Sequence, residues 1–150
     1  MDKGKIAKQL FENGYNCSQA IVLAFKDELK LDETTLFSMS SSFGGGISRL
    51  REVCGCVSAM ALIMGLLYGN YDPLDNEKKA NHYKLIQELT MKFKDKFNSY
   101  NCATLLNKEN KIDSYIPEIR NESYYSKRPC VKFIEYMSNI VEKKINERKN

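Results

Sequence analysis

The sequence predicts an all-α fold in one domain, residues 1–150, with five to seven helices around a buried central helix at about residues 53–68. Residues 53–68 carry no charge and are small or apolar on every side, which is typical of a helix packed all round. Elsewhere apolar residues recur at three- and four-residue steps, and no stretch alternates at period two. The length and the apolar content of 43% suit one globular domain.

Three helices are expected before the central one. Residues 3–12 show an amphipathic pattern that predicts the first. Asn16 is a good N-cap for a second helix that runs to about residue 30. Asp32 caps a short third helix with apolar residues at positions 36, 37 and 39, and a loop of serines and glycines then leads into the central helix.

Three further helices are expected after the central one. A long amphipathic helix covers about 74–98, and Asn101 caps a short helix that follows it. The segment 107–128 is polar and broken by a proline, which predicts irregular structure with one short helical turn. The last helix is expected to open within Arg128-Pro129-Cys130, with Pro129 at the first helical position.

Charge and length narrow the classes of function. The net charge of +4 is spread over mixed faces without a basic cluster among aromatics, so we expect no nucleic-acid partner. The apolar central stretch is shorter than the ~20 residues of a bilayer span, so we expect no membrane segment. The first residues show no secretory pattern, so we expect a cytoplasmic protein. Because the cytoplasm is reducing, we expect its cysteines to be free or metal-bound rather than joined in structural disulfides. Small residues in the central helix are compatible with a homodimer.

Four cysteines fall in the first turn of a predicted helix, where the helix dipole and free N–H groups lower a thiol pKa or donate to a cluster sulfur. The alternative is that they are buried as small hydrophobic residues, because their separations match no CxxC pattern. We expect the loop before the central helix to line the same site. The candidate ligand or redox thiols are Cys17, Cys54, Cys102 and Cys130, and the candidate lining residues are Gly44, Gly45, Gly46, Arg49 and Arg51.

Three other features are assigned to structure rather than chemistry. Residues two apart on a helix point about 200° from one another, so we assign the chemistry to Cys54 and treat Cys56 as packing. His82, the one histidine, lies on an apolar helical stripe and reads as a core residue rather than a ligand or proton shuttle. The three glycines lack a following GK[ST] and a preceding strand, so we read them as close backbone contacts rather than a phosphate cradle.

Four segments together resemble a known family: NCSQAIVLAF, SSFGGGISRLREVCGCVSAMALIMGLLYG, NCATLL, and the cysteine that opens the last helix. They resemble the C_GCAxxG_C_C family of redox-active proteins, which is related in pattern to the C-terminal part of split-Soret cytochromes. The likeness runs from about Asn16 to Val141. The family's four separated cysteines correspond to Cys17, Cys54, Cys102 and Cys130. This chain departs from the pattern with Cys56 and Ala59, where relatives commonly have alanine and glycine.

The resemblance implies a redox role without naming a substrate or a redox partner, and leaves open whether the chain is an enzyme. In one version the four thiolates hold an iron–sulfur cluster for electron transfer, and Arg49 and Arg51 offset its negative charge. In a second, Cys17 and Cys54 form and break a disulfide without metal. In a third, the cysteines hold a structural zinc in a non-catalytic module. No CxxCH occurs, so covalent haem is not expected.

Overall fold

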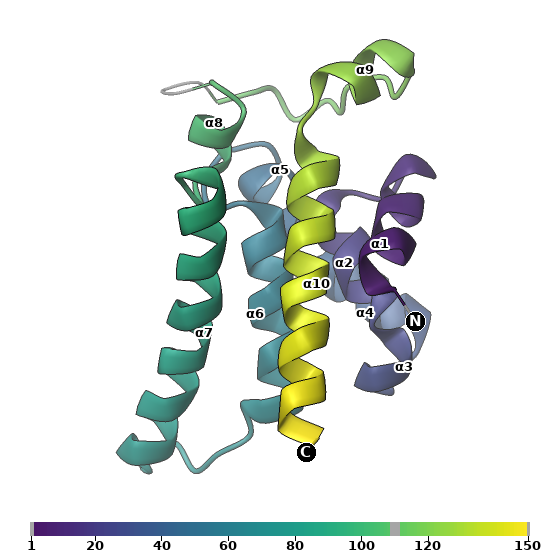
Figure 1. Ribbon diagram of the computed structural model, residues 1–150. Coiled ribbons are helices and arrows are strands. Elements are labelled where there is room, and N and C mark those ends of the chain that lie inside the picture. The colour runs from purple at the N-terminus through teal and green to yellow at the C-terminus, as the bar shows by residue number, and fades with distance from the viewer. Residues whose placement is uncertain (1, 109–111, 150) are drawn as a thin grey trace.

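The computed structural model describes residues 2–108 and 112–149 as a helical bundle (Figure 1). Its central helix is α6 (Gly55–Tyr68). The long helices packed against it are α2 (Cys17–Ala24), α7 (Asn76–Phe97) and α10 (Cys130–Lys149), and α1 (Lys3–Glu12) packs against α2 and α10. The described residues contain no strand, and their β pairing is an isolated bridge between Val53 and Asn101. The predicted all-α class is confirmed.

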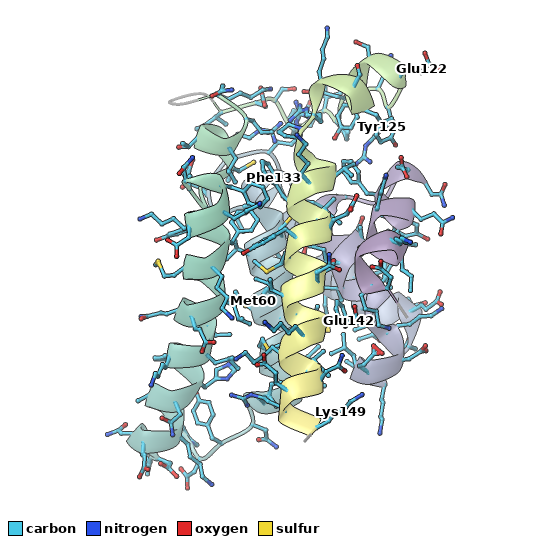
Figure 2. All side chains as sticks on the ribbon, in the orientation of Figure 1. Met60, Glu122, Tyr125, Phe133, Glu142 and Lys149 are labelled. Carbon is cyan, nitrogen blue, oxygen red and sulfur yellow. The ribbon has the colours of Figure 1, made fainter. Side chains whose placement is uncertain are left out.

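Short elements connect the long helices. They are α3 (Lys26–Leu29), α4 (Glu33–Ser40), the 3-10 helix η1 (Ser41–Phe43), α5 (Gly44–Ile47), α8 (Cys102–Leu105) and α9 (Glu122–Lys127). Figure 1 shows α5, α8, α9 and the start of α10 at the same end of the bundle, while the C-terminus lies at the opposite end. The side chains labelled in Figure 2 mark these ends, with Tyr125 and Phe133 at the first and Lys149 at the second.

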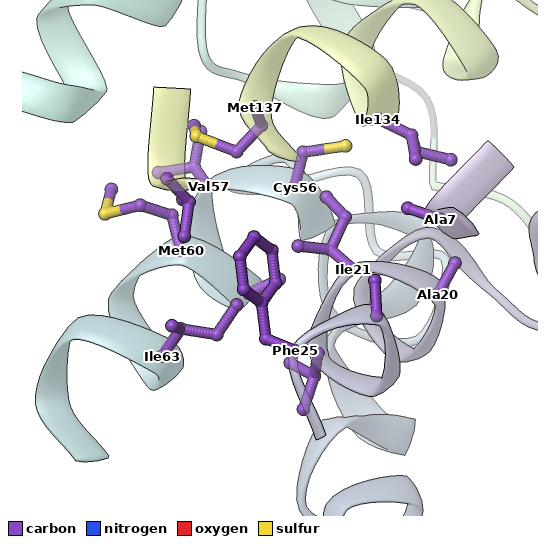
Figure 3. Packing of buried hydrophobic residues seen from close by; sticks show 14 of the residues in the cluster. Ala7, Ala20, Ile21, Phe25, Cys56, Val57, Met60, Ile63, Ile134 and Met137 are labelled. Atoms are coloured by element: carbon purple, nitrogen blue, oxygen red, sulfur yellow. The ribbon is translucent and has the colours of Figure 1, made fainter. Parts of the chain in front are cut away.

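The core confirms α6 as the centre of the fold. Met60, Ile63 and Met64 of α6 are fully buried, but Leu66 is 40% exposed, so the helix is not packed on every side as the sequence predicted. In Figure 3 the labelled residues Met60 and Ile63 approach Phe25, which comes from the segment just after α2. Burial of such side chains contributes about 1.5–3 kcal/mol each. No helix in the described ranges is long and apolar enough to cross a bilayer.

Three predicted N-caps are confirmed. The side-chain oxygen of Asn16 accepts a hydrogen bond from the Gln19 backbone N–H at 2.8 Å, and the Gln19 side chain accepts one from the Asn16 N–H at 3.0 Å. Asp32 caps α4, and Asn101 caps α8. These local contacts set the residues at which the helices begin, and so place Cys17 and Cys102 at helix starts.

Two predicted boundaries differ from the structure. The helix expected to run from residue 17 to about 30 breaks at Phe25, whose backbone (φ −104°, ψ 19°) leaves the helical range while its ring is fully buried. Packing therefore overrides a sequence that favours a continuous helix. The last helix begins at Cys130, one residue after Pro129. The helical turn expected within 107–128 is α9, and residues 109–111 of that segment lie outside the described residues.

Candidate cysteine-lined redox site

A cavity of about 320 Å³ lies at the end of the bundle formed by α5, α8 and the start of α10. Its wall includes the four cysteines singled out in the sequence, together with four of the five predicted lining residues; Gly46 lies against Cys102 without facing the cavity. Each of these four cysteines begins or caps a different helix: α2, α6, α8 and α10. The fold therefore brings together thiols that are far apart in the sequence. The cysteines that line the cavity are Cys17, Cys54, Cys56, Cys102 and Cys130.

Glycines allow the backbone to approach these sulfurs closely. A Cβ added at Gly55 would lie 2.4 Å from the Sγ of Cys17, and one at Gly46 would lie 2.6 Å from the Cβ of Cys102. Both distances are shorter than the 3.4 Å at which ordinary contact begins. Close approach to the cysteines, the purpose expected for the glycine-rich loop, is thus confirmed at Gly46.

The loop before α6 adopts an unusual backbone. Residues 45–49 all have positive φ, including Ile47 at 66° and Arg49 at 73°, and Arg51 follows at 63°. A left-handed conformation costs a non-glycine residue roughly 1–2 kcal/mol, and such strain is concentrated at functional sites. Hydrogen bonds from the N–H of Arg51 to Gly45 O (3.2 Å) and of Glu52 to Gly46 O (2.8 Å) hold the loop in this shape. The turn directs Arg49 and Arg51 toward the cavity.

Cys17 has the most reactive thiol that the structure indicates. The Cys56 thiol donates a hydrogen bond to its sulfur, and this contact lowers the pKa of Cys17 to about 7. Burial opposes the shift, while the backbone N–H groups of Gly45 and Ser18 and the charge of Arg120 add to it. About half of Cys17 is therefore a thiolate at neutral pH.

Cys102 and Cys130, which also stand at helix starts, do not share this behaviour. Burial raises the pKa of Cys130 to about 12. Burial also raises the pKa of Cys102, although Arg51 Nη1 donates to its sulfur at 3.6 Å. The expectation that a helix start lowers the pKa of each thiol therefore fails at these two residues, because the cost of desolvating a thiolate there exceeds the gain from nearby positive charge.

Cys56 corrects a second expectation. Because α6 begins at Gly55, Cys54 precedes the helix in an extended conformation (ψ 133°), and the 200° separation of two helical residues does not apply. Both cysteines line the cavity. Cys56 is 1% exposed, and its thiol is within hydrogen-bond reach of both Cys17 and Cys54 while it also packs in the core (Figure 3). Burial raises the pKa of Cys56 well above its ordinary value.

A comparison with protein families agrees with this arrangement of cysteines. The family model described as "Putative redox-active protein (C_GCAxxG_C_C)" matches residues 15–144, which include all five cysteines. The chain belongs to the C_GCAxxG_C_C family. No curated protein and no solved structure matches it. The resemblance found in the sequence is thereby confirmed, and the redox role it implies agrees with the description of the family.

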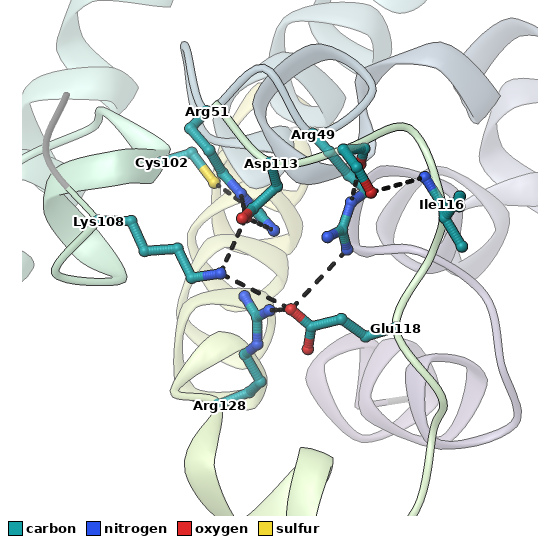
Figure 4. A network of polar contacts seen from close by, with 9 residues as sticks. Arg49, Arg51, Cys102, Lys108, Asp113, Ile116, Glu118 and Arg128 are labelled. Atoms are coloured by element: carbon teal, nitrogen blue, oxygen red, sulfur yellow. Dashed lines mark hydrogen bonds and ion pairs between the residues drawn. The ribbon is translucent and has the colours of Figure 1, made fainter. Parts of the chain in front are cut away.

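A network of ion pairs and hydrogen bonds joins three arginines of the cavity wall to two carboxylates in this C_GCAxxG_C_C protein (Figure 4). Asp113 accepts from Arg51 at 2.7 Å and from Lys108 at 2.8 Å, and these contacts lower the pKa of Asp113 to about 2. Glu118 pairs with Arg128 and lies 3.9 Å from Arg49. The segment carrying both carboxylates is thus tied across the arginines that line the site. No local sequence pattern marks these two carboxylates as partners of the arginines, so they were not predicted.

Arg120 of the C_GCAxxG_C_C protein is a second residue that the sequence analysis missed. Its guanidinium lies over the ring of Phe11 at 4.6 Å and over that of Tyr124 at 5.0 Å, and its Nη1 donates to the Phe11 carbonyl at 2.9 Å. All three residues line the cavity. An arginine in a polar segment carries no sequence signal for such a position.

Two observations concern metal ligands in this C_GCAxxG_C_C protein. Within residues 2–108 and 112–149, no group of three or more His, Cys, Asp and Glu side chains is placed so that it could hold a metal ion. His82 does not line the cavity; its ring lies 6.0 Å from that of Tyr71, and its buried Nδ1 has no hydrogen-bond partner among the described residues.

Proposed function

We propose that the protein carries out thiol–disulfide exchange in this cavity, with Cys17 as the attacking thiolate and Cys56 as the second thiol of the pair. The observation that carries the proposal is the hydrogen bond from the Cys56 thiol to a Cys17 sulfur whose pKa is lowered to about 7. An attacking thiol works best when its pKa is near the ambient pH. The pair differs from the Cys17 and Cys54 pair expected from the sequence, since Cys56 contacts Cys17 directly.

The proposed reaction has two steps. The Cys17 thiolate attacks one sulfur of a substrate disulfide, forms a mixed disulfide, and releases the other half of the substrate as a thiolate. That thiolate takes the Cys56 proton, and the new Cys56 thiolate attacks the Cys17 sulfur and displaces the second half. The protein loses two electrons as Cys17 and Cys56 form a disulfide, and the substrate disulfide gains them and becomes one thiol and one thiolate, which takes its proton from water.

The test uses reduced protein and bis(2-hydroxyethyl) disulfide. Wild type should form a Cys17–Cys56 disulfide, which peptide mass spectrometry detects. Cys56→Ser should stop at the mixed disulfide on Cys17. Cys17→Ser should react with the disulfide at least about ten-fold more slowly than wild type. Cys54→Ser is the matched control and should still form the disulfide. Equal reaction of all five thiols, or a disulfide that does not include Cys17, would count against the proposal.

A second candidate is supported by a different observation: four cysteines from four separate helix starts line one cavity. Cys17, Cys54, Cys102 and Cys130 would hold an iron–sulfur cluster, which would supply one-electron transfer. The guanidinium of Arg51, which already donates to Cys102, would offset negative charge there. The sulfurs would have to move, because the described residues do not form a metal-holding group.

Anaerobic purification separates the two candidates. Brown protein with stoichiometric iron and sulfide, lost on Cys130→Ser, would favour the cluster. Colourless protein that contains stoichiometric zinc would favour a structural zinc site instead. Colourless protein without metal that exchanges disulfides through Cys17 would support the dithiol reaction.

A further inference from the structure

We infer that the cavity binds a small disulfide that carries a carboxylate, and that Arg120 holds the carboxylate while Cys17 attacks the disulfide. The inference rests on the proposed function and adds the chemical class of the substrate. It would make Arg120 the residue that determines specificity, a role that neither the family description nor the proposed exchange reaction assigns.

The cavity is positively charged. Its wall carries four arginines and one glutamate, namely Arg49, Arg51, Arg120, Arg128 and Glu118. Arg51 is neutralised by Asp113, and Arg49 and Arg128 share Glu118. Among residues 2–108 and 112–149, no carboxylate pairs with Arg120. A half-buried cation that lines a cavity and has no carboxylate partner in the described chain attracts an anionic ligand.

The surroundings of Arg120 leave it able to bind a carboxylate. A guanidinium has five N–H donors, and the described contact with the Phe11 carbonyl uses one of them. The rings of Phe11 and Tyr124 lie together on one side of it, with centroids 6.4 Å apart, and the donors that no described contact uses lie in the guanidinium plane. Donors in that plane match the two oxygens of a carboxylate. The aromatic contacts also fix the side chain in place before a ligand arrives, which lowers the entropy cost of binding.

The position of Arg120 relative to Cys17 suits a single small ligand. Both residues line the same cavity, and Arg120 is close enough for its charge to act on the Cys17 thiolate. A volume of about 320 Å³ is at the lower end of the range for small-molecule pockets. Phe11, Leu105 and Phe133 provide apolar wall for the carbon chain of the ligand. A compact molecule with a carboxylate at one end and a disulfide within reach of Cys17 fits these features better than a protein disulfide does.

Three disulfides of similar length and different charge test the inference. They are 3,3′-dithiodipropionate, bis(2-hydroxyethyl) disulfide and cystamine, which are dianionic, neutral and dicationic. Each rate with the protein is divided by the rate of the same disulfide with 2-mercaptoethanol, at equal thiolate concentration. For wild type the corrected rate should be highest for the dianion. Arg120→Gln should lower the ratio of the dianion rate to the neutral rate by about 10- to 100-fold, the range expected for a lost charged hydrogen bond. The ratio cancels the effect of the lost charge on the Cys17 thiolate, which slows both reactions alike.

Two further variants control for charge and folding. Arg120→Lys should keep part of the preference for the dianion. Arg148→Gln removes another arginine that lies over an aromatic ring, Tyr68 at 4.4 Å, but at the opposite end of α10, and it should behave as wild type. Circular dichroism establishes that each variant is folded. If Arg120→Gln keeps the wild-type preference for the dianion, the inference is overturned.

A binding measurement separates this inference from the proposed reaction. Octanedioate has the length of dithiodipropionate but no disulfide, and it should slow alkylation of Cys17 by iodoacetamide in wild type and not in Arg120→Gln. Protection that depends on Arg120, in a protein that exchanges no disulfide, would support the anion site and overturn the exchange reaction. Exchange that proceeds equally with all three disulfides, without protection by octanedioate, would support the reaction and overturn the anion site.

Discussion

Replacing Gly55 with alanine should displace the Cys17 sulfur and remove its reactivity. The new Cβ would lie 2.4 Å from Cys17 Sγ and 2.9 Å from the carbonyl oxygen of Phe43. Ordinary contact begins at 3.4 Å, so the sulfur must retreat by about 1 Å. Overpacking of this kind costs roughly 1–3 kcal/mol, which lowers the Tm of a chain of this size by about 2–12 °C.

The displacement should also change the titration of Cys17. Loss of the contacts from Cys56 and Gly45 would return its pKa from about 7 toward the ordinary 9.0. At pH 7 the thiolate fraction would then fall from about one half to about one hundredth. The higher intrinsic nucleophilicity of a more basic thiolate recovers part of this loss, so alkylation should slow by about 5- to 10-fold. The assay is the pH dependence of iodoacetamide alkylation of Cys17, followed by peptide mass spectrometry.

Gly65→Ala is the matched control on the same helix. A Cβ at Gly65 meets no heavy atom within 4 Å, so the change should raise helix stability by up to about 1 kcal/mol and leave Cys17 reactive. If Gly55→Ala were as stable as Gly65→Ala and kept the wild-type alkylation profile, the close contact between α2 and the start of α6 would not control Cys17.

Three further predictions concern stability. The pKa of Cys130 is raised to about 12 in the folded protein and is near 9.0 when unfolded, so its contribution to stability is present below pH 9 and is lost as pH rises through 12. In urea titrations between pH 9 and 11, wild type should therefore lose up to about 1.4 kcal/mol of unfolding free energy per pH unit more than Cys130→Ala. Parallel curves of stability against pH for the two proteins would refute this. Asp113→Asn leaves the buried Arg51 without its carboxylate and should lower the free energy of unfolding by about 1–3 kcal/mol at pH 7. Glu33→Gln, which breaks an exposed ion pair, should lower it by less than about 0.5 kcal/mol. Equal losses of stability in urea titrations would contradict the role of burial. Lys30, exposed with φ 57°, should accept glycine with a gain of about 0.5–1 kcal/mol by thermal unfolding, and Lys30→Ala, the control, should show no gain.

Local chemistry accounts for the parts of the fold that were predictable from the sequence. Asn16, Asp32 and Asn101 cap helices through contacts three residues away, so their effect is visible without knowledge of the rest of the chain. The uncharged run at 53–68 likewise determined the position of the buried helix within about two residues of α6. The break at Phe25 was not visible, because it results from packing of a buried ring against other helices.

By itself the sequence determined the helical class, the central helix and the placing of four cysteines at helix starts, because these follow from periodicity and from contacts between near neighbours. Tertiary structure alone decided which thiol is ionised, that Cys56 belongs to the site, and that Arg120 reaches the Phe11 carbonyl across 109 positions of the chain. The physical reason is that the ionisation of a thiol depends on the hydrogen bonds, the burial and the charges that folding brings to it. The same local feature, a cysteine at a helix start, therefore has a pKa of about 7 at Cys17 and of about 12 at Cys130.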